Sequence, residues 1–374
     1  MFMIRKRPRI LFVTTISSTL QAGGTIFSRT VRESIPGEYE VVNLILSDAR
    51  KYKSKTVRWI NAVLKSFVTF VPPNVLFHSA SLTPDAIKLL RGGWDMVICD
   101  HLESCYTLTY LPSIPSLYVS HNRESKVVFE KFSRAPYFIR VFLSRWVDRY
   151  EIQITKSVDA VVSISRDECA WYKTHSDNVE IIYPVFAVSK KLPEIPENRA
   201  VLRIGFLGRH GWFPNLEAVK LMINKILPLT SRRIDFLVVG DGWVGGELKT
   251  GLVANMNGRG VNIIMGGYMS DVGLFWKQID LFVAPIVSGS GVNVKVCEAL
   301  ANKVPVLALP HATRGLTGNI LSCGGLFVAH SEVDFAKMLD EFDVTTVAMT
   351  PPVEFTSEYA NQRMSQRLTS LLNC

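Results

Sequence analysis

The sequence predicts an α/β protein with two parallel-sheet domains, and three observations support this. Short apolar, β-branched segments alternate with helix-like segments along the chain, as in βαβ units. The 374 residues, 48% hydrophobic and 20% charged, exceed the ~150 residues typical of one domain. The stretch FAVSKKLPEIPENRA has two prolines, mixed charge and no periodicity, as expected of a linker. We therefore expect two parallel-sheet α/β domains over residues 1–190 and 191–374, with the boundary near 188–201.

Each half of the chain contains its own series of predicted strands. In the first half they fall at 9–15, 40–46, 96–100, 116–120, 160–164 and 179–182. In the second half they fall at 202–207, 234–239, 262–265, 281–284 and 304–308. A helix of mixed polarity is expected over 354–372, where it could pack back on the N-terminal domain. Two such sheets would direct the carboxyl ends of their strands, where open α/β sheets bind ligands, toward one central cleft.

Composition and cysteine spacing restrict the location and the class of protein. No apolar run reaches the ~20 residues that cross a bilayer, and the apolar run after the basic N-terminus is too short for a secretory signal. The six cysteines show no metal-binding spacing, so we interpret them as reduced thiols. These features favour a cytoplasmic protein.

Positive charge is concentrated in the first half of the chain. Residues 1–190 hold 25 Lys and Arg against 17 Asp and Glu, whereas residues 191–374 hold 17 against 16. In 51–70, Lys51, Lys55, Arg58 and Lys65 recur at near-helical intervals, with Trp59, Val63, Phe67 and Phe70 available to another face. One interpretation is a helix that docks on an anionic inner membrane; the other is a helix with a core face and a solvated face. The basic residues form no nucleic-acid-binding motif, so no nucleic-acid partner is expected.

The segment SGSGVNVKVCEALANKVPVLAL, which begins at residue 288, is typical of a phosphate-binding turn. Gly289 and Gly291 permit backbone conformations that bring main-chain amides close to a ligand. A helix starting near Asn293 would add the positive end of its dipole, and Lys295 a full charge. Glu298, about one turn later, could accept hydrogen bonds from sugar hydroxyls. The alternative is an ordinary strand-turn-helix unit whose glycines make a tight connection.

The order of motifs in the second half resembles a known family. RIGFLGRHGWFPNLEAVKLMINKILP, FLVVGDG and LFVAPIVSGSGVNVKVCEALANKVPVLAL follow one another as in GT-B glycosyltransferases, and the set is similar to family four, the retaining, nucleotide-sugar-dependent group. The likeness is strong over about 203–327 and scattered before that. It implies two Rossmann-like domains around a cleft and transfer of a hexose from a nucleoside diphosphate sugar.

The resemblance assigns roles to the glycine turn and the helix after it. Glu298 resembles the second acid of the family's Glu-x7-Glu motif, which binds the ribose of the donor. The first acid would fall at Ser290, where this chain departs from the pattern and loses a carboxylate contact to the hexose. The amides of Gly291 and Val292 would lie near the distal phosphate.

A second set of residues is implied to neutralise the leaving diphosphate. Arg209 resembles the family arginine with this role. The family often has a lysine six residues later, and here that position is Asn215. We expect Lys295 to supply the missing charge.

In the first half, the resemblance points to the loops after three strands. Gly23 and Gly24 resemble the glycine-rich loop after the first strand. His121 corresponds to a histidine beside the donor sugar, although a lone histidine at a strand end is more often structural. Glu124 is expected to hold the same loop. His101 and Glu103 follow the strand at 96–100 and are expected to line the acceptor side.

The implied chemistry is electrostatic stabilisation of the departing diphosphate. No DxD motif follows a strand, and Asp340 and Asp343 are poor metal ligands because they lie in an acidic, helical segment. We therefore expect no required cofactor and no metal. The expected partners are a nucleotide-sugar donor and a saccharide or lipid-linked acceptor, with synthesis of a bacterial surface polysaccharide, lipopolysaccharide or glycolipid as the setting. A UDP-sugar 2-epimerase and a nucleotide-sugar-binding module without turnover remain the alternatives.

Overall fold

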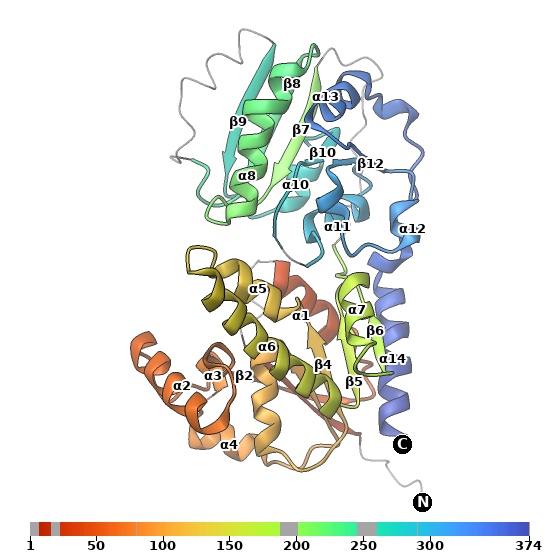
Figure 1. Cartoon of the computed structure of the whole chain (residues 1–374). Coiled ribbons are helices and arrows are strands. Elements are labelled where there is room, and N and C mark those ends of the chain that lie inside the picture. Colours follow the sequence, from red (N-terminus) through yellow and green to blue (C-terminus); the bar gives the residue numbers. More distant parts are fainter. Residues whose placement is uncertain are drawn as a thin grey trace, which may run out of the picture. The chain divides into compact units, whose positions relative to one another are not determined.

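The computed structural model describes residues 7–15, 23–79, 81–187, 201–244, 260–289 and 291–373. The chain divides into two compact units (Figure 1). Unit 1 comprises Met1–Val185 with Thr356–Cys374, and unit 2 comprises Phe186–Phe355. Each unit contains one six-stranded, entirely parallel sheet, so the predicted α/β class is confirmed. The boundary predicted near 188–201 falls almost wholly on residues outside the described ranges.

The sheet of unit 1 has the strand order β2-β1-β3-β4-β5-β6. Its central strands β3 and β4 are buried at every position, which suits a parallel sheet covered on both faces. The strands are β1 Arg9–Thr14, β2 Glu40–Ile45, β3 Met96–Asp100, β4 Ser116–Ser120, β5 Ala160–Ser163 and β6 Val179–Ile181. Every one matches a predicted strand to within one residue at each end.

Helices of unit 1 begin where short polar side chains can cap them. Ser54, Thr83 and Ser165 accept hydrogen bonds from the first turns of α2, α4 and α7. The helices are α1 Gly23–Glu33, α2 Lys55–Thr69, α3 Pro73–Ser79, α4 Pro84–Leu90, the 3₁₀ helix η1 Leu102–Tyr110, α5 Glu124–Lys131, α6 Tyr137–Ser157 and α7 Arg166–Tyr172.

The C-terminal helix α14, Ser357–Leu372, belongs to unit 1 although unit 2 precedes it in the chain. It lies beside α1 and β6. Arg363 and Arg367 form ion pairs with Glu180 of β6 at 2.8 and 3.3 Å. The helix also buries one apolar side of its surface: Ala360, Met364, Leu368 and Leu371.

The sheet of unit 2 has the order β12-β11-β10-β7-β8-β9. Its strands are β7 Leu202–Leu207, β8 Ile234–Val239, β9 Val261–Gly267, β10 Leu281–Ala284, β11 Val306–Ala308 and β12 Leu326–Val328. The sequence did not predict β12, because its three half-buried residues carry little pattern. Among the described residues of this unit, the α-helices are α8 Phe213–Leu221, α10 Val272–Trp276, α11 Val294–Ala301, α12 Gly318–Leu321 and α13 Glu332–Glu341. Short turns complete the unit: the π-helical η2 Met222–Ile226 and the 3₁₀ segments η3 Leu227–Leu229, η4 Pro310–Thr313, η5 Val344–Thr346 and η6 Val353–Phe355.

The predicted basic, aromatic helix is present as α2, and its aromatic residues are not core. Trp59, Val63, Phe67 and Phe70 all have exposed side chains. In the part of the chain that is described, no single helix has the length and apolarity to cross a membrane. The pair α2 and α3 passes that test together, with a bend of 117° between them.

Candidate functional site

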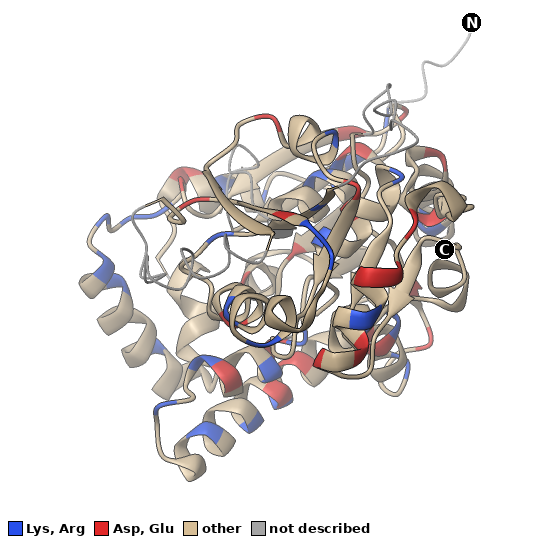
Figure 2. Ribbon diagram, turned by 90° about the horizontal axis from the view of Figure 1, so that it is seen from above, with Lys and Arg blue, Asp and Glu red and all other residues tan. Residues whose placement is uncertain are grey.

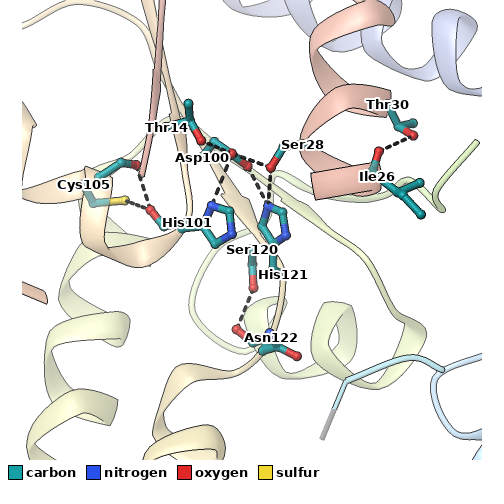
Figure 3. Close-up of polar contacts among 11 residues, drawn as sticks. Thr14, Ile26, Ser28, Thr30, Asp100, His101, Cys105, Ser120, His121 and Asn122 are labelled. Carbon is teal, nitrogen blue, oxygen red and sulfur yellow. Dashed lines mark hydrogen bonds and ion pairs between the residues drawn. The ribbon is translucent and has the colours of Figure 1, made fainter. Parts of the chain in front are cut away.

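Strand order brings polar residues from three strands of unit 1 to one point. Strands β1, β3 and β4 are neighbours, and each ends in or is followed by a polar side chain: Thr14, Asp100 and His121. Asp100 is fully buried, and its carboxylate accepts hydrogen bonds from Thr14 Oγ1 and from Ser28 Oγ of α1, both at 2.7 Å. His121 Nε2 lies 2.6 Å from the other oxygen, Oδ1 (Figure 3).

His101 completes this cluster in an unusual backbone conformation. Its φ is 73°, in the left-handed region that residues with a Cβ avoid at a cost of about 1–3 kcal/mol. A hydrogen bond from its amide to Val119 O, 3.0 Å, holds it against β4. Its Nδ1 lies 3.2 Å from Asp100 Oδ2, and its ring stacks on that of His121 with centroids 3.6 Å apart. Strain of this kind is typical of a functional position.

Only one of the two stacked rings can readily carry a charge. Burial disfavours the charged form of His101, but the adjacent Asp100 carboxylate overcomes it and raises the pKa of His101 to about 9. Burial and the positive charge of His101 lower the pKa of His121 to about 4. Burial opposes ionisation of Asp100, yet the two histidines hold its pKa well below the ordinary value. At neutral pH the cluster is therefore a carboxylate, an imidazolium and a neutral imidazole.

The tautomer of His121 follows from this arrangement. An ionised Asp100 only accepts hydrogen bonds, so the proton of the neutral ring lies on Nε2. Its Nδ1 then holds a lone pair, and that buried atom has no hydrogen-bond partner among the described residues. Nδ1 of His121 can thus accept a hydrogen bond from a ligand hydroxyl.

Asp100, His101 and His121 also offer three ligand atoms within 4.8 Å of one another, so they are a candidate metal site. The ring geometry disfavours it. A histidine binds a metal along a lone pair in its ring plane, at about 2.0–2.1 Å. The two ring planes are inclined by only 13° at a centroid separation of 3.6 Å, so their lone pairs do not converge on one ion. The arrangement suits a hydrogen-bonded network better than a metal centre.

Three glutamates lie near the histidine cluster: Glu103, Glu124 and Glu151. The amide of Glu124 donates to Glu151 Oε1 at 3.3 Å, and Tyr172 Oη donates to the same oxygen at 2.5 Å. Burial raises the pKa of Glu151 to about 7, although the bond from Tyr172 opposes the shift. Burial and the neighbours Glu103 and Glu151 raise the pKa of Glu124 as well. The Glu124 amide thus joins the start of α5 to Glu151 of α6, and a role for its side chain in the His121 loop stays a prediction.

Gly23 and Gly24 lie in a helix rather than in a loop, and their predicted contact with the donor stays a prediction. They are the first two residues of α1. Amides in the first turn of a helix have no intrahelical acceptor, so glycine is tolerated there and the helix can begin directly at this pair. Residues 16–22, which precede them, lie outside the described residues.

In unit 2 the glycine turn precedes α11. Gly289 and Gly291 have φ values of 101° and 71°, so both use the conformational freedom predicted for them. Val292 is buried, and Asn293 precedes the first residue of the helix. Ser290, the position of the missing acid, lies outside the described residues.

A hydrogen-bonded chain joins three positions that the sequence singled out. The Asn215 side chain is buried, donates to Arg209 O at 2.7 Å, and accepts from Lys295 Nζ at 2.6 Å. The structure therefore brings the Lys295 ammonium group to the residue that replaces the family lysine. The Arg209 side chain is exposed.

The charge of Lys295 is adjustable. Burial lowers its pKa to about 8, with Arg314 lowering it further and Glu298 opposing the shift. An anion bound nearby would favour the ammonium form and raise this pKa again. Glu298 is half-buried on the same helix, three residues from Lys295, so the two side chains share a face.

Several residues around the glycine turn were not predicted. His311 Nε2 lies 3.0 Å from Gly289 O, and Arg314 Nη1 donates to His311 O at 2.7 Å. Ser288 donates to Glu217 of α8. The segment HATRG begins three residues after the end of β11, so its position near a strand's carboxyl end was the available signal. Likewise, Asp100 and Ser28 were missed because their role depends on which strands are neighbours.

Comparison with known proteins places these residues in context. Residues 202–342, which include Arg209, Asn215, Lys295 and Glu298, match the family model described as "Glycosyl transferases group 1". The chain also aligns with the sucrose-phosphate synthase of Thermosynechococcus elongatus at a TM-score of 0.58 and 15% identity, over 98% of this chain and 95% of that one. Residues 202–342 are thus a group 1 glycosyltransferase domain, and the chain has the GT-B fold.

Other proteins with which this chain aligns have the same fold. The lipopolysaccharide outer core galactosyltransferase WaaB aligns with a TM-score of 0.59 at 12% identity, over 97% and 99% of the two chains. Alr3699/HepE of Anabaena, solved with UDP-glucose, aligns with a TM-score of 0.59 at 13% identity, over 97% and 100%. An uncharacterised 44.6 kDa protein in the cps region of Klebsiella pneumoniae is 24% identical over 309 residues, 76% of this chain and 74% of the relative.

Proposed function

We propose that this glycosyltransferase moves a hexose from a nucleoside diphosphate sugar to a saccharide or lipid-linked acceptor, with retention at the anomeric carbon. The proposed setting is synthesis of a bacterial surface polysaccharide, in the cytoplasm at the inner face of the membrane. The cps-region relative supports this setting. The Anabaena protein solved with UDP-glucose makes UDP the first nucleotide to test.

The observation that carries the proposal is the contact between Lys295 and Asn215, 2.6 Å, at the start of α11. Transfer requires that negative charge developing on the leaving diphosphate be stabilised by groups already in place. Lys295 and Arg209 would supply full charges. The amides of Gly291 and Val292 and the dipole of α11 would supply partial ones. Glu298 would accept hydrogen bonds from the ribose.

The cluster of unit 1 would contribute at the sugar. Nδ1 of His121 would accept a hydrogen bond from a sugar hydroxyl, and Asp100 holds the ring in the tautomer that allows this. His101 and Glu103 would line the acceptor side. Metal independence is part of the proposal: chelation should leave transfer unchanged, and loss of transfer restored by magnesium or manganese would contradict it.

A donor screen tests the proposal. UDP-, GDP- and ADP-sugars are compared by thermal shift, because a ligand that binds only the folded state stabilises it. The selected donor is then incubated with saccharide acceptors, and the anomeric configuration of the product is determined by NMR. Transfer with retention is expected. Donor binding without transfer or hydrolysis would instead identify a binding module, and conversion of the donor alone would identify an epimerase, which the group 1 match does not favour.

A pair of substitutions tests whether Lys295 supplies the charge that is missing at Asn215. Lys295→Ala should weaken donor binding and turnover by at least about tenfold, since charge-assisted hydrogen bonds contribute about 1.5–3 kcal/mol. Adding Asn215→Lys to that variant returns a charge to the same place and should restore part of both. Donor affinity and turnover near wild type in Lys295→Ala would remove Lys295 from the mechanism.

A further inference from the structure

Helix α2 exposes a continuous apolar stripe. Ile60, Leu64 and Val68 follow one another at intervals of four residues, with Phe67 beside them, so they share one side of the helix. Phe67, Val68 and Phe70 are 73%, 81% and 80% exposed. The opposite side carries the buried Ala62 and Ser66, which face α3 and the rest of unit 1. The core therefore already uses one side of α2, and the apolar stripe is additional to it.

The first turns of α6 extend this stripe. Tyr137 and Phe138 are both 71% exposed, and Phe142 is 62% exposed. Trp146 connects the two helices: its Nε1 donates to Phe70 O at 2.8 Å, and its ring lies 5.9 Å from that of Phe142. An exposed apolar surface assembled from two elements is typical of an interaction site.

Positive charge surrounds these apolar side chains. Residues 51–70 and 131–145 contain nine Lys and Arg and no Asp or Glu. Basic residues of α2 and α6 are drawn blue in Figure 2. Six of the nine basic residues in the two segments are exposed: Lys51, Lys53, Lys55, Lys131, Arg134 and Arg145. A second copy of the chain would bring nine cations against nine, so charge favours an anionic occupant.

Length and composition identify that occupant. The fifteen residues of α2 span about 22 Å, less than the ~30 Å hydrocarbon core, so the helix is too short to cross a bilayer. Aliphatic side chains such as Ile60 and Leu64 offer nothing to stack on bases, which argues against a nucleic acid. An apolar stripe with basic flanks suits a helix that lies in the plane of a membrane interface.

We propose that α2 and the first turns of α6 form a docking surface for an anionic phospholipid bilayer. The apolar side chains insert below the headgroups, while the exposed lysines and arginines bind lipid phosphates. The inference locates the membrane contact of the proposed function on named residues. It can be tested without a donor or an acceptor, so its failure is distinguishable from failure of the transfer reaction.

The test is cosedimentation of the full chain with vesicles of phosphatidylcholine alone or with added phosphatidylglycerol. Wild type should bind the anionic vesicles, and less so at high salt. Leu64→Ser with Phe67→Ser, and separately Lys53→Glu with Lys55→Glu, should each reduce binding by at least about tenfold. Val333→Ser and Lys277→Glu alter exposed residues of unit 2 and should bind as wild type.

Equal binding of wild type to neutral and anionic vesicles would overturn the proposal. Unchanged binding of the Leu64→Ser, Phe67→Ser variant would also overturn it, because charge alone would then explain adsorption. If sedimentation equilibrium shows a dimer that this variant dissociates, a second copy covers the surface instead. All substituted side chains are exposed, so circular dichroism and donor affinity should match wild type in every variant.

Discussion

At the scale of single residues, the lowered pKa of Lys295 has a measurable consequence. Only its ammonium form can neutralise a diphosphate, and burial lowers the pKa of that group to about 8. UDP affinity should therefore fall about twofold between pH 7 and 8, where half of the ammonium form is lost, and then by up to about tenfold per pH unit. Titration calorimetry of UDP over this range measures it.

Lys295→Arg provides the comparison, because arginine keeps its charge throughout this range. The affinity of that variant should fall less above pH 8. Lys277→Arg, an exposed position in the same unit, should follow the wild-type curve. If Lys295→Arg loses UDP affinity over the same pH interval as wild type, a group other than Lys295 causes the loss.

His101 makes stability depend on pH in the alkaline range. Its folded-state pKa of about 9 exceeds the ordinary value of 6.5, so its contribution is complete below pH 6.5 and disappears as pH rises through 9. This loss amounts to about 3 kcal/mol in the free energy of unfolding. His121 has the opposite shift, so stability should also fall as pH drops from 6.5 toward 4.

Urea unfolding at pH 6.5 and pH 9 tests the role of His101. His101→Gln removes the titrating group but keeps a Cβ at the same positive φ, so the backbone cost stays the same. The variant should lose much less stability between the two pH values than wild type does. Equal losses in the variant and in wild type would show that a group other than His101 causes the loss of stability at alkaline pH.

At the scale of elements, α14 stabilises a unit from which it is remote in sequence. Leu368 is fully buried, so Leu368→Ala should lower the free energy of unfolding of unit 1 by about 2–5 kcal/mol. Gln362→Ala changes an exposed position of the same helix and should stay within about 0.5 kcal/mol of wild type. Urea unfolding followed by circular dichroism compares the two. A small effect of Leu368→Ala would mean that α14 is only loosely packed.

Local sequence predicted the strands well because buried parallel strands are short, nearly continuous apolar runs, as in β3 and β4. It failed for β12, which has three residues and no fully buried position. The Asp100 cluster could not be predicted from the sequence for another reason. Thr14, Asp100 and His121 meet only because β1, β3 and β4 are neighbours, and strand order is not encoded locally. The contact between Asn215 and Lys295 spans 80 residues, and the family resemblance, rather than spacing, suggested it.

At the scale of the whole molecule, each unit has its own sheet and its own buried core. Gly240 of unit 2 shows how tightly one of these units is built. It has φ 144°, and a Cβ there would lie 2.2 Å from Gly208 O, so Gly240→Ala should destabilise unit 2 selectively. Leu368→Ala should do the same to unit 1. Each variant therefore identifies the unfolding transition of one unit.

These two variants allow donor binding to be assigned to one unit. We predict two calorimetric transitions, one lowered by Gly240→Ala and the other by Leu368→Ala. A UDP-sugar that binds through Lys295 and Glu298 should stabilise unit 2 by about 2.7 kcal/mol at 100 times its Kd. It should raise the temperature of only one transition, the one that Gly240→Ala lowers. Lys295→Ala, scanned at the same donor concentration, should abolish most of that shift. A single transition that both variants lower, or a donor shift confined to the transition of unit 1, would contradict a donor site built by the residues around α11.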